Sequence, residues 1–290
     1  MRIRAYAKIN LGFEVLGRRS DGLHEVATIL QTIDLADSVT LSPSDRITLH
    51  CPGMEVRPDN LILQAAYLMK ERAGVSEGVA IRCIKRIPVG SGLAGGSADA
   101  AAVLCGLWSY WDVRLDQATV YDVAGQLGAD VPFCLAGGTA LATGDGRQLE
   151  LLPDAPPHWV VLVPLGSTDP EKTGHMYRHL TKADWSSGEA VHRQAQALQE
   201  GRIDYGCLRS AFAATARETW PEVNRALASL EASGALAACV SGAGPSCFGL
   251  FRTRGEAVRA RNRLVAQGCP GMVHRFVTAA DCRSRPAPPV

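Results

Sequence analysis

The sequence predicts an α+β fold. Segments with strand periodicity lie near both ends of the 290-residue chain, and segments with helix caps lie between and among them. They do not follow the regular strand–helix–strand order that a doubly wound parallel sheet requires. A chain of this length forms one large domain or two ordinary ones, and the proline-rich stretch 153–157 is the best candidate for a linker.

The opening segment alternates with a period of two. One set of side chains is apolar and the other mostly polar, which predicts a strand with one buried face. The apolar set is Ala5, Ala7, Ile9, Leu11, Phe13 and Val15, and the other set is Arg4, Tyr6, Lys8, Asn10, Gly12 and Glu14. A polar loop over 17–22 ends in Asp-Gly, which is a turn signal, and a second strand is expected over 25–35.

The rest of the first half contains both helix and strand signals. Asn60 as a cap and Gly74 as a stop predict a helix between them. The remaining elements expected here are a strand over 79–87, helices over 97–108 and 116–128, and two short strands within 138–152 around a turn at 144–146.

The second half is also mixed. The strands expected there are 159–163, 237–240, 247–251 and 272–278, and the helices are 171–180, 189–199, 203–215, 221–233 and 255–267. The proline-rich tail over 285–290 is expected to be disordered.

Composition narrows the class of protein. The formal net charge is +1, so no overall bias toward nucleic acid or an anionic membrane is present. No apolar run has the ~20 residues of a membrane helix, and no secretory signal is visible, so the cytoplasm is the expected compartment. The nine cysteines are odd in number and irregularly spaced, which predicts reduced, buried thiols. The sequence sets no oligomeric state.

A glycine-rich loop precedes the predicted helix over 97–108. Its residues are Pro88, Val89, Gly90, Ser91, Gly92, Leu93, Ala94, Gly95, Gly96 and Ser97. Such a loop lets backbone N–H groups approach a phosphate, and the helix N-terminus adds a positive dipole end. The alternative is a tight turn, which needs fewer glycines. Residues 90–95 also match GxGxxG, a weak signal alone, and no Walker A sequence occurs in the chain.

Three further segments carry candidate functional residues. Lys8 and Asn10 share one face of the first strand, and Lys8 is one of five lysines against 25 arginines. Asp130 lies in Gly-Ala-Asp-Val-Pro-Phe at the end of a predicted helix, where burial would raise its pKa unless a cation such as Lys8 lies beside it. A second glycine turn, over 241–246, joins two predicted strands, and a plain connection is its alternative interpretation.

Together these segments resemble the ordered motifs of the GHMP kinases, from about residue 2 to 280. The resemblance implies a two-domain α+β fold. Its N-terminal domain, over 1–154, would resemble ribosomal protein S5 domain 2 and bind ATP. Its C-terminal domain, over 155–290, would be ferredoxin-like and bind the second substrate, with a disordered tail.

The resemblance also implies an activity. The segments 5–11 and 21–25 are similar to those of members that use ATP and Mg²⁺ to phosphorylate a cytidyl diphosphate sugar alcohol on the route to isoprenoid precursors. Asp130 would orient, and could deprotonate, the attacking hydroxyl, and Lys8 would hold that carboxylate ionised. The loop from Gly90 to Ser97 would surround the ATP phosphates.

The second substrate would meet five residues. The resemblance implies a contact from Asn10, reading of the cytosine edge by His24, and a Thr173–Tyr177 pattern whose ring stacks on cytosine; an ordinary helix-face tyrosine is the alternative for Tyr177. Leu23 stands where the family usually has tyrosine, so one cover of the base would be aliphatic.

Two other departures from the family concern the loop and the metal. Ala94 replaces a loop glycine, which predicts an unstrained backbone there. Ala98 replaces a hydroxyl after Ser97, so metal contact would rest on Ser97 or on phosphates and water, and the metal ligands stay unassigned.

Three alternative functions remain open on the sequence. The first is a GHMP kinase for homoserine or mevalonate, which would lack a cytosine pocket. The second is an inactive GHMP-fold regulator, against which the presence of Lys8 and Asp130 argues. The third is a nicotinamide dehydrogenase using the GxGxxG match.

Overall fold

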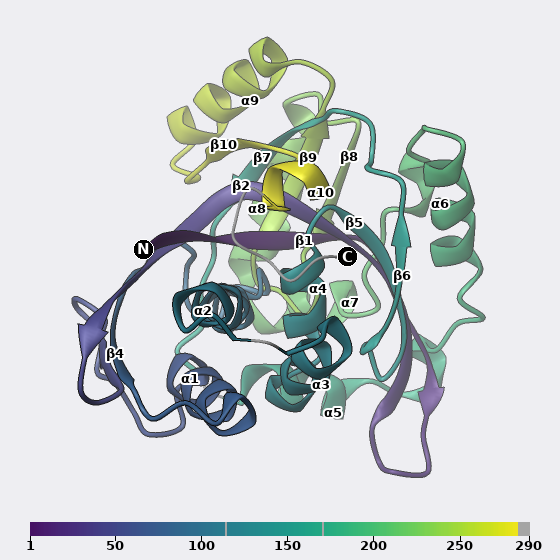
Figure 1. The fold of residues 1–290 in the computed structure, drawn as a ribbon. Coiled ribbons are helices and arrows are strands. Elements are labelled where there is room, and N and C mark those ends of the chain that lie inside the picture. Colours follow the sequence, from purple (N-terminus) through teal and green to yellow (C-terminus); the bar gives the residue numbers. More distant parts are fainter. Residues whose placement is uncertain (114, 170, 284–290) are drawn as a thin grey trace.

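Two sheets, each covered by helices, make up the protein in a computed structural model that describes residues 1–113, 115–169 and 171–283 (Figure 1). The strands of the first sheet are β1 (Arg2–Arg18), β2 (His24–Ser44), β3 (Thr48–His50), β4 (Gly78–Ile84), β5 (Thr139–Gly144) and β6 (Gln148–Leu152). Their order is β3-β4-β2-β5-β6, and β1 also pairs with β2. Only the β3–β4 pair is parallel, which excludes a doubly wound sheet among the described residues.

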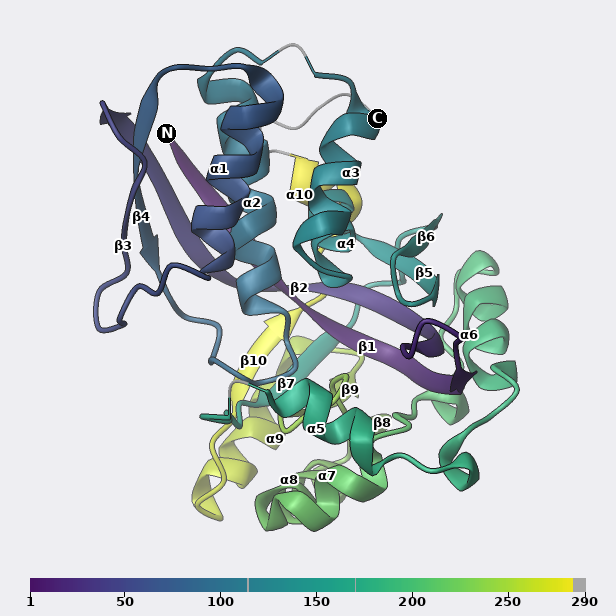
Figure 2. The same ribbon diagram turned by 90° about the horizontal axis from the view of Figure 1, so that it is seen from below.

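Helices cover one face of this sheet, as Figures 1 and 2 show. They are α1 (Leu61–Ala73), α2 (Gly95–Tyr110), α3 (Gln117–Leu127) and α4 (Asp130–Ala136). The predicted caps of α1 are confirmed, because Asn60 accepts a hydrogen bond from the N–H of Ile62 and Gly74 adopts the left-handed conformation. Asp116 caps α3 in the same way through the N–H of Thr119.

The second sheet has the order β10-β7-β9-β8 and is antiparallel throughout. Its elements are β7 (Trp159–Val163), α8 (Pro221–Ala232), β8 (Ala237–Val240), β9 (Cys247–Phe251), α9 (Arg254–Ala266) and β10 (Met272–Arg275). This succession and strand order form a ferredoxin-like unit, as expected. The helices α5 (Lys172–His179), α6 (Glu189–Gln199) and α7 (Ala213–Thr219) enter between β7 and α8.

The prediction of one buried face for the first strand was wrong. Residues 5–12 of β1 are buried on both faces. The helix α2 packs on one side, while segments of the second half approach the other and pair with Phe13 and Val15. The alternation therefore separates an apolar face in the core from a polar face that includes the buried Lys8 and Asn10.

Three other expectations change. The helix expected over 203–215 is a short 3₁₀ turn, Tyr205–Cys207, followed by an extended stretch and then α7, because Ser210 pairs with β1. The strand expected over 25–35 continues to Ser44, because β4 supplies a partner for its second half. Asp130 is the first residue of α4, a helix that the sequence analysis did not identify, rather than the end of α3.

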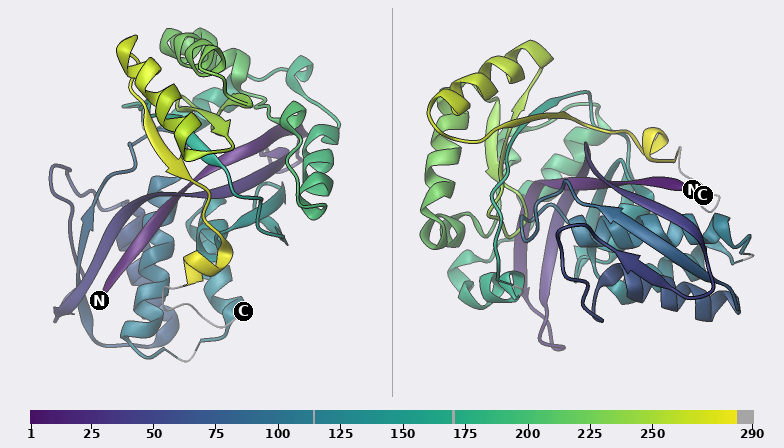
Figure 3. Two further views of the ribbon diagram at one scale, coloured as in Figure 1. Left: turned by 90° about the horizontal axis from the view of Figure 1, so that it is seen from above. Right: turned by 90° about the vertical axis from the view of Figure 1, so that its left-hand side faces the viewer.

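The end of the described chain returns to the first sheet. Beyond β10, the N–H of Val277 donates to Thr32 O, and α10 (Ala279–Arg283) lies beside α4 (Figure 3). The tail expected to be disordered, 285–290, lies outside the described residues. All nine cysteines are buried, as predicted. No helix in the described ranges is long and apolar enough to cross a membrane.

Candidate active site

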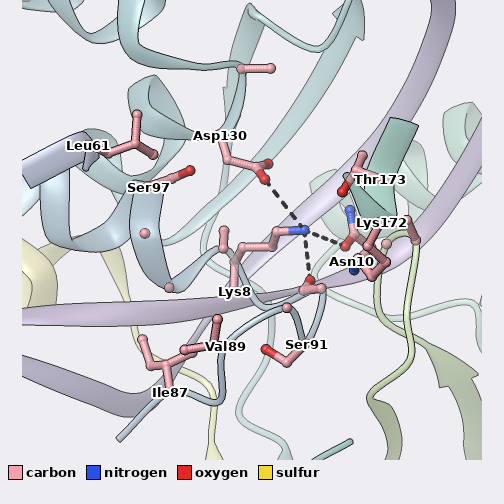
Figure 4. Close-up of a pocket in the computed structure, with 18 of the residues that line it drawn as sticks. Lys8, Asn10, Leu61, Ile87, Val89, Ser91, Ser97, Asp130, Lys172 and Thr173 are labelled. Carbon is pink, nitrogen blue, oxygen red and sulfur yellow. Dashed lines mark hydrogen bonds and ion pairs between the residues drawn. The ribbon is translucent and has the colours of Figure 1, made fainter. Parts of the chain in front are cut away.

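A cavity of about 700 Å³ lies where the two halves of the chain meet. Its walls come from β1, the glycine-rich loop 88–97, the start of α4, α5 and the second glycine turn 241–246. Lys8 and Asp130 lie in its middle in Figure 4, with Ser97 and Leu61 on one side and Thr173, Lys172 and Asn10 on the other.

Lys8 joins three elements around this cavity. Its Nζ donates hydrogen bonds to Asn10 Oδ1 at 2.8 Å and to Gly92 O at 3.2 Å, and lies 3.9 Å from Asp130 Oδ2. The Lys8 side chain is 6% exposed, whereas that of Asp130 is 39% exposed. The cation is therefore fixed within the protein, and the carboxylate keeps a face open to a ligand.

Asn10 is held by its own partners. Its Nδ2 donates to Thr28 Oγ1 at 2.8 Å, and Thr28 Oγ1 donates to Gly12 O at 2.6 Å. This chain of hydrogen bonds sets the Asn10 amide so that its oxygen faces Lys8.

The glycine-rich loop 88–97 follows the cavity wall and leads into α2. All its residues except the buried Leu93 line the cavity. Gly92 has φ +83°, and a Cβ there would overlap with Ser241 O and lie 2.9 Å from Gly244 O. Gly92 O also accepts a hydrogen bond from Ser241 Oγ. The loop thus contacts the second glycine turn with no space for a side chain, which explains this glycine.

Ala94 contradicts the expectation of an unstrained backbone. It has φ +57° and ψ +35°, the left-handed region, at the cap of α2. Ala94 is the N-cap residue of α2, which begins at Gly95, so this backbone conformation sets how the loop enters the helix. An alanine there costs ~1–2 kcal/mol relative to a right-handed conformation.

We therefore expect Ala94→Gly to stabilise the protein. Glycine removes the left-handed penalty and is the better cap, and the added freedom of the unfolded chain offsets part of the gain. The expected net effect is about 0.5–1.5 kcal/mol in the free energy of unfolding, measured by urea denaturation. Ala102→Gly, inside the same helix, is the control and should destabilise by ~1 kcal/mol or more. Equal losses for both would contradict strain at Ala94.

Two of the residues expected to bind a nucleobase, Thr173 and Tyr177, line the cavity, and Thr173 lies on the side of Lys8 and Asp130 opposite Ser97 in Figure 4. The His24 and Tyr177 rings stack with centroids 4.8 Å apart. The Phe212 and Tyr177 rings pack edge to face, with their centroids 4.9 Å apart. Leu23 is 48% exposed and, like His24, is not part of the cavity lining. Burial lowers the pKa of His24, which favours a neutral ring at pH 7.

A buried ionic cluster behind the glycine-rich loop was not anticipated from the sequence. Lys85 Nζ bonds to Asp37 and Asp99, and Asp37 also accepts the N–H groups of Arg86 and Ile87. Burial and the neighbouring Asp37 raise the pKa of Asp99, against the opposing charge of Lys85. The cluster fixes β2, the start of the loop and α2 to one another. Lys85 was visible as a scarce lysine beside the loop, but nothing local indicated its partners.

Lys172 is a second residue that the sequence analysis missed. It begins α5, is 6% exposed and donates from Nζ to Gly244 O. Burial, and then the charge of Lys8, lower its pKa to about 8. The scarcity of lysine was the only available signal.

Comparison with known proteins identifies the family. Residues 60–138 match the family description "GHMP kinases N terminal domain", and residues 190–270 match "GHMP kinases C terminal". The chain is 40% identical over 282 residues to a protein of Gloeobacter violaceus named 4-diphosphocytidyl-2-C-methyl-D-erythritol kinase, covering 94% of this chain and 92% of that protein. The chain belongs to the GHMP kinase family.

Two more relatives of this GHMP kinase carry the same kind of name. A Bacillus licheniformis protein, 4-diphosphocytidyl-2-C-methyl-D-erythritol kinase, is 40% identical over 273 residues, covering 91% of this chain and 93% of its own. The crystal structure of a 4-(cytidine 5'-diphospho)-2C-methyl-D-erythritol kinase is 35% identical with a TM-score of 0.80, covering 95% of this chain and 99% of that one. The expected GHMP fold is therefore confirmed across nearly the whole chain.

Proposed function

We propose that this GHMP kinase is a 4-diphosphocytidyl-2-C-methyl-D-erythritol kinase, which transfers the γ-phosphoryl group of ATP to the 2-hydroxyl of its acceptor in the non-mevalonate isoprenoid pathway. The names of the relatives support the substrate. One observation in the structure carries the chemistry. The Lys8–Asp130 pair lies in one cavity with the glycine-rich loop and with Tyr177, on which the His24 ring stacks.

In the proposed mechanism, the ATP phosphates lie along the loop 88–97 and the N-terminus of α2. Asp130 accepts a hydrogen bond from the acceptor hydroxyl and so orients the hydroxyl oxygen toward the γ-phosphorus. The new O–P bond forms as the bond from the γ-phosphorus to the bridging oxygen breaks, ADP leaves, and the Asp130 carboxylate is placed to take the proton. Lys8, 3.9 Å away, offsets the carboxylate charge and faces the transferring group. Positioning and charge compensation supply most of the catalysis in such a reaction.

Magnesium fits this site as part of the nucleotide complex. No cluster of three or more His, Cys, Asp or Glu that could hold a metal occurs among residues 1–113, 115–169 and 171–283. Mg²⁺ typically binds substrate phosphates and keeps several waters, so a protein cage is not needed. The Ser97 hydroxyl at the start of α2 lines the cavity and would be the protein ligand. Bound to ATP, the ion would neutralise phosphate charge.

Two further proposals concern the domain boundary and the location of the protein. We place the division between the ATP-binding and substrate-binding domains at 154/155, where the chain passes from β6 to β7. We also propose a cytoplasmic location, because the nine cysteines are buried, odd in number and irregularly spaced, unlike a disulfide framework, which suits a reducing compartment.

A coupled ADP-release assay tests the function. ATP and Mg²⁺ are supplied with 4-diphosphocytidyl-2-C-methyl-D-erythritol, mevalonate, homoserine or galactose as the acceptor. Of these four acceptors, only the cytidyl compound is expected to give ADP release well above background. Turnover with mevalonate or homoserine in its place would overturn the substrate, and no turnover with any acceptor would favour an inactive regulator.

Substitutions at the aromatic end test nucleobase binding. Tyr177→Ala should raise the KM for the cytidyl acceptor about tenfold or more, because it removes the ring that would stack on cytosine, while the KM for ATP stays unchanged. Tyr177→Phe is the matched control and should stay near wild type. Leu23→Tyr should lower the acceptor KM a few-fold to roughly tenfold, since an added offset stack is worth ~0.5–1.5 kcal/mol. If neither Tyr177→Ala nor Leu23→Tyr alters the acceptor KM, the cytosine pocket lies elsewhere.

A further inference from the structure

Lys172 is a buried cation to which the described residues supply no anionic partner. It is 6% exposed, and its Nζ donates to the backbone oxygen of Gly244. Within residues 1–113, 115–169 and 171–283, no carboxylate oxygen lies within 4.0 Å of that nitrogen. An ammonium group has three donors, and buried charges are normally paired. The arrangement leaves this cation able to bind an anion in the cavity.

The position of Lys172 identifies which anion could reach it. In Figure 4, Lys172 and Thr173 lie on the side of the Lys8–Asp130 pair opposite Ser97, where α2 and the glycine-rich loop begin the proposed ATP site. Tyr177, the proposed cytosine platform, lies further along the same helix as Lys172. Lys172 therefore lines the same cavity as Asp130 of the proposed transfer site and shares helix α5 with Tyr177 of the proposed nucleobase site.

The charge of the proposed acceptor lies on its diphosphate, which joins the sugar alcohol to the cytidine. The hydroxyl of the sugar alcohol would contact Asp130, and the cytosine base would contact Tyr177. We propose that Lys172 binds the diphosphate of the acceptor and so contributes to its selection over acceptors without phosphate. This inference rests on the proposed function and adds a residue that neither the glycine-rich loop nor the Lys8–Asp130 pair supplies.

The electrostatic surroundings fit an anion site. The charged groups that face Lys172 are Lys8 of β1, Asp130 of α4 and Asp169 before α5. Burial and the repulsion of Lys8 together lower the pKa of Lys172 to about 8, despite the two carboxylates. A diphosphate beside Lys172 would relieve that repulsion and hold the ammonium form.

A purely structural role is the main alternative. The hydrogen bond to Gly244 ties α5 to the second glycine turn, and its loss could disturb the whole cavity. A structural role predicts lower stability and weaker binding of both substrates in Lys172→Met. A ligand role predicts weaker binding of the diphosphate alone, with partial recovery in Lys172→Arg, which keeps the charge.

Calorimetric titrations separate these roles. The probes are CDP and cytidine, each added with ADP saturating the donor site, and a nonhydrolysable ATP analogue added alone. Lys172→Met should weaken CDP binding about tenfold to a hundredfold, the range for one charge-assisted hydrogen bond, and leave cytidine and the ATP analogue unchanged. Lys182→Met, which removes an exposed lysine charge outside the cavity, should match wild type.

The pH dependence gives a second readout. Wild-type affinity for CDP should fall as the pH rises from 7 to 9.5, because Lys172 loses its proton above a pKa of about 8. The fall should be absent in Lys172→Met. The lowered pKa of His24 places its titration below this range, so His24 does not contribute.

Each remaining outcome counts against the proposal. Unchanged CDP affinity in Lys172→Met would overturn it, and weaker binding of the ATP analogue alone would move the contact to the donor phosphates. Equal losses for every probe, together with a lower melting temperature, would show a structural role. If wild type bound neither CDP nor cytidine, the proposed function itself would fail, whatever the variants did.

Discussion

Asp130→Asn should lower kcat by about 10²–10⁴-fold, the range for loss of a positioned general base. The amide keeps the shape of the side chain but loses its charge and its ability to take a proton. Because the side chain is 39% exposed and forms no short hydrogen bond within the described residues, the fold should tolerate the change. The KM values for both substrates should change far less than kcat, since Asp130 acts mainly in the transition state.

Asp145→Asn is the matched control for this prediction. Asp145 lines the same cavity, but its carboxylate is paired with Arg147. Its loss should change kcat no more than a few-fold. The measurement is steady-state kinetics of both variants, with thermal melts to verify folding. Near wild-type turnover in Asp130→Asn would remove Asp130 from the mechanism and leave the cavity without an identified catalytic carboxylate.

Gly92→Ala should both weaken ATP binding and lower the stability of the protein. A left-handed alanine costs ~1–2 kcal/mol, and the overlap with Ser241 O adds a repacking cost of ~1–3 kcal/mol. The free energy of unfolding should fall by about 2–5 kcal/mol. Any shift that relieves the overlap also moves Gly92 O away from Lys8, so the KM for ATP should rise about tenfold or more.

Gly96→Ala, four residues along the same loop, provides the comparison. A Cβ at Gly96 meets Leu61 Cδ1 at 3.5 Å, which is an ordinary contact, and the residue lies within α2. Helix propensity then makes alanine equal to or slightly better than glycine for stability. The measurements are the free energy of unfolding from urea denaturation and the KM for ATP, for both variants. A Gly96→Ala variant as unstable as Gly92→Ala would show that the contact with the second glycine turn does not explain Gly92.

Local signals in the sequence were reliable where the physics is local. Asn60 and Gly74 bound α1 as expected, because a cap depends on a few neighbouring backbone groups. The helix expected over 203–215 failed for the opposite reason. Residue 210 pairs with Phe13 far away in sequence, and that pairing outweighs a local preference for helix.

The family resemblance correctly placed Ala94 in the glycine-rich loop. It did not predict the left-handed conformation that Ala94 adopts at the cap of α2. The expectation of an unstrained backbone assumed that alanine would avoid the left-handed region. In the structure, that conformation sets how the loop enters α2, which begins at Gly95. The surrounding packing sustains a local cost that no sequence pattern displays.

The α+β class and the glycine-rich loop before a helix could be predicted from the sequence alone, as could the importance of Lys8 and Asp130, which the structure brings together. Short-range patterns record turns, caps and the spacing of apolar faces. The burial of both faces of β1 and the distance of 3.9 Å between Lys8 Nζ and Asp130 Oδ2 became visible in the folded structure. The folded structure also placed Lys172 in the same cavity without a carboxylate partner in the described ranges. Burial and ion pairing depend on which distant segments pack together, and a period of two is the same whether a strand's second face meets water or another domain.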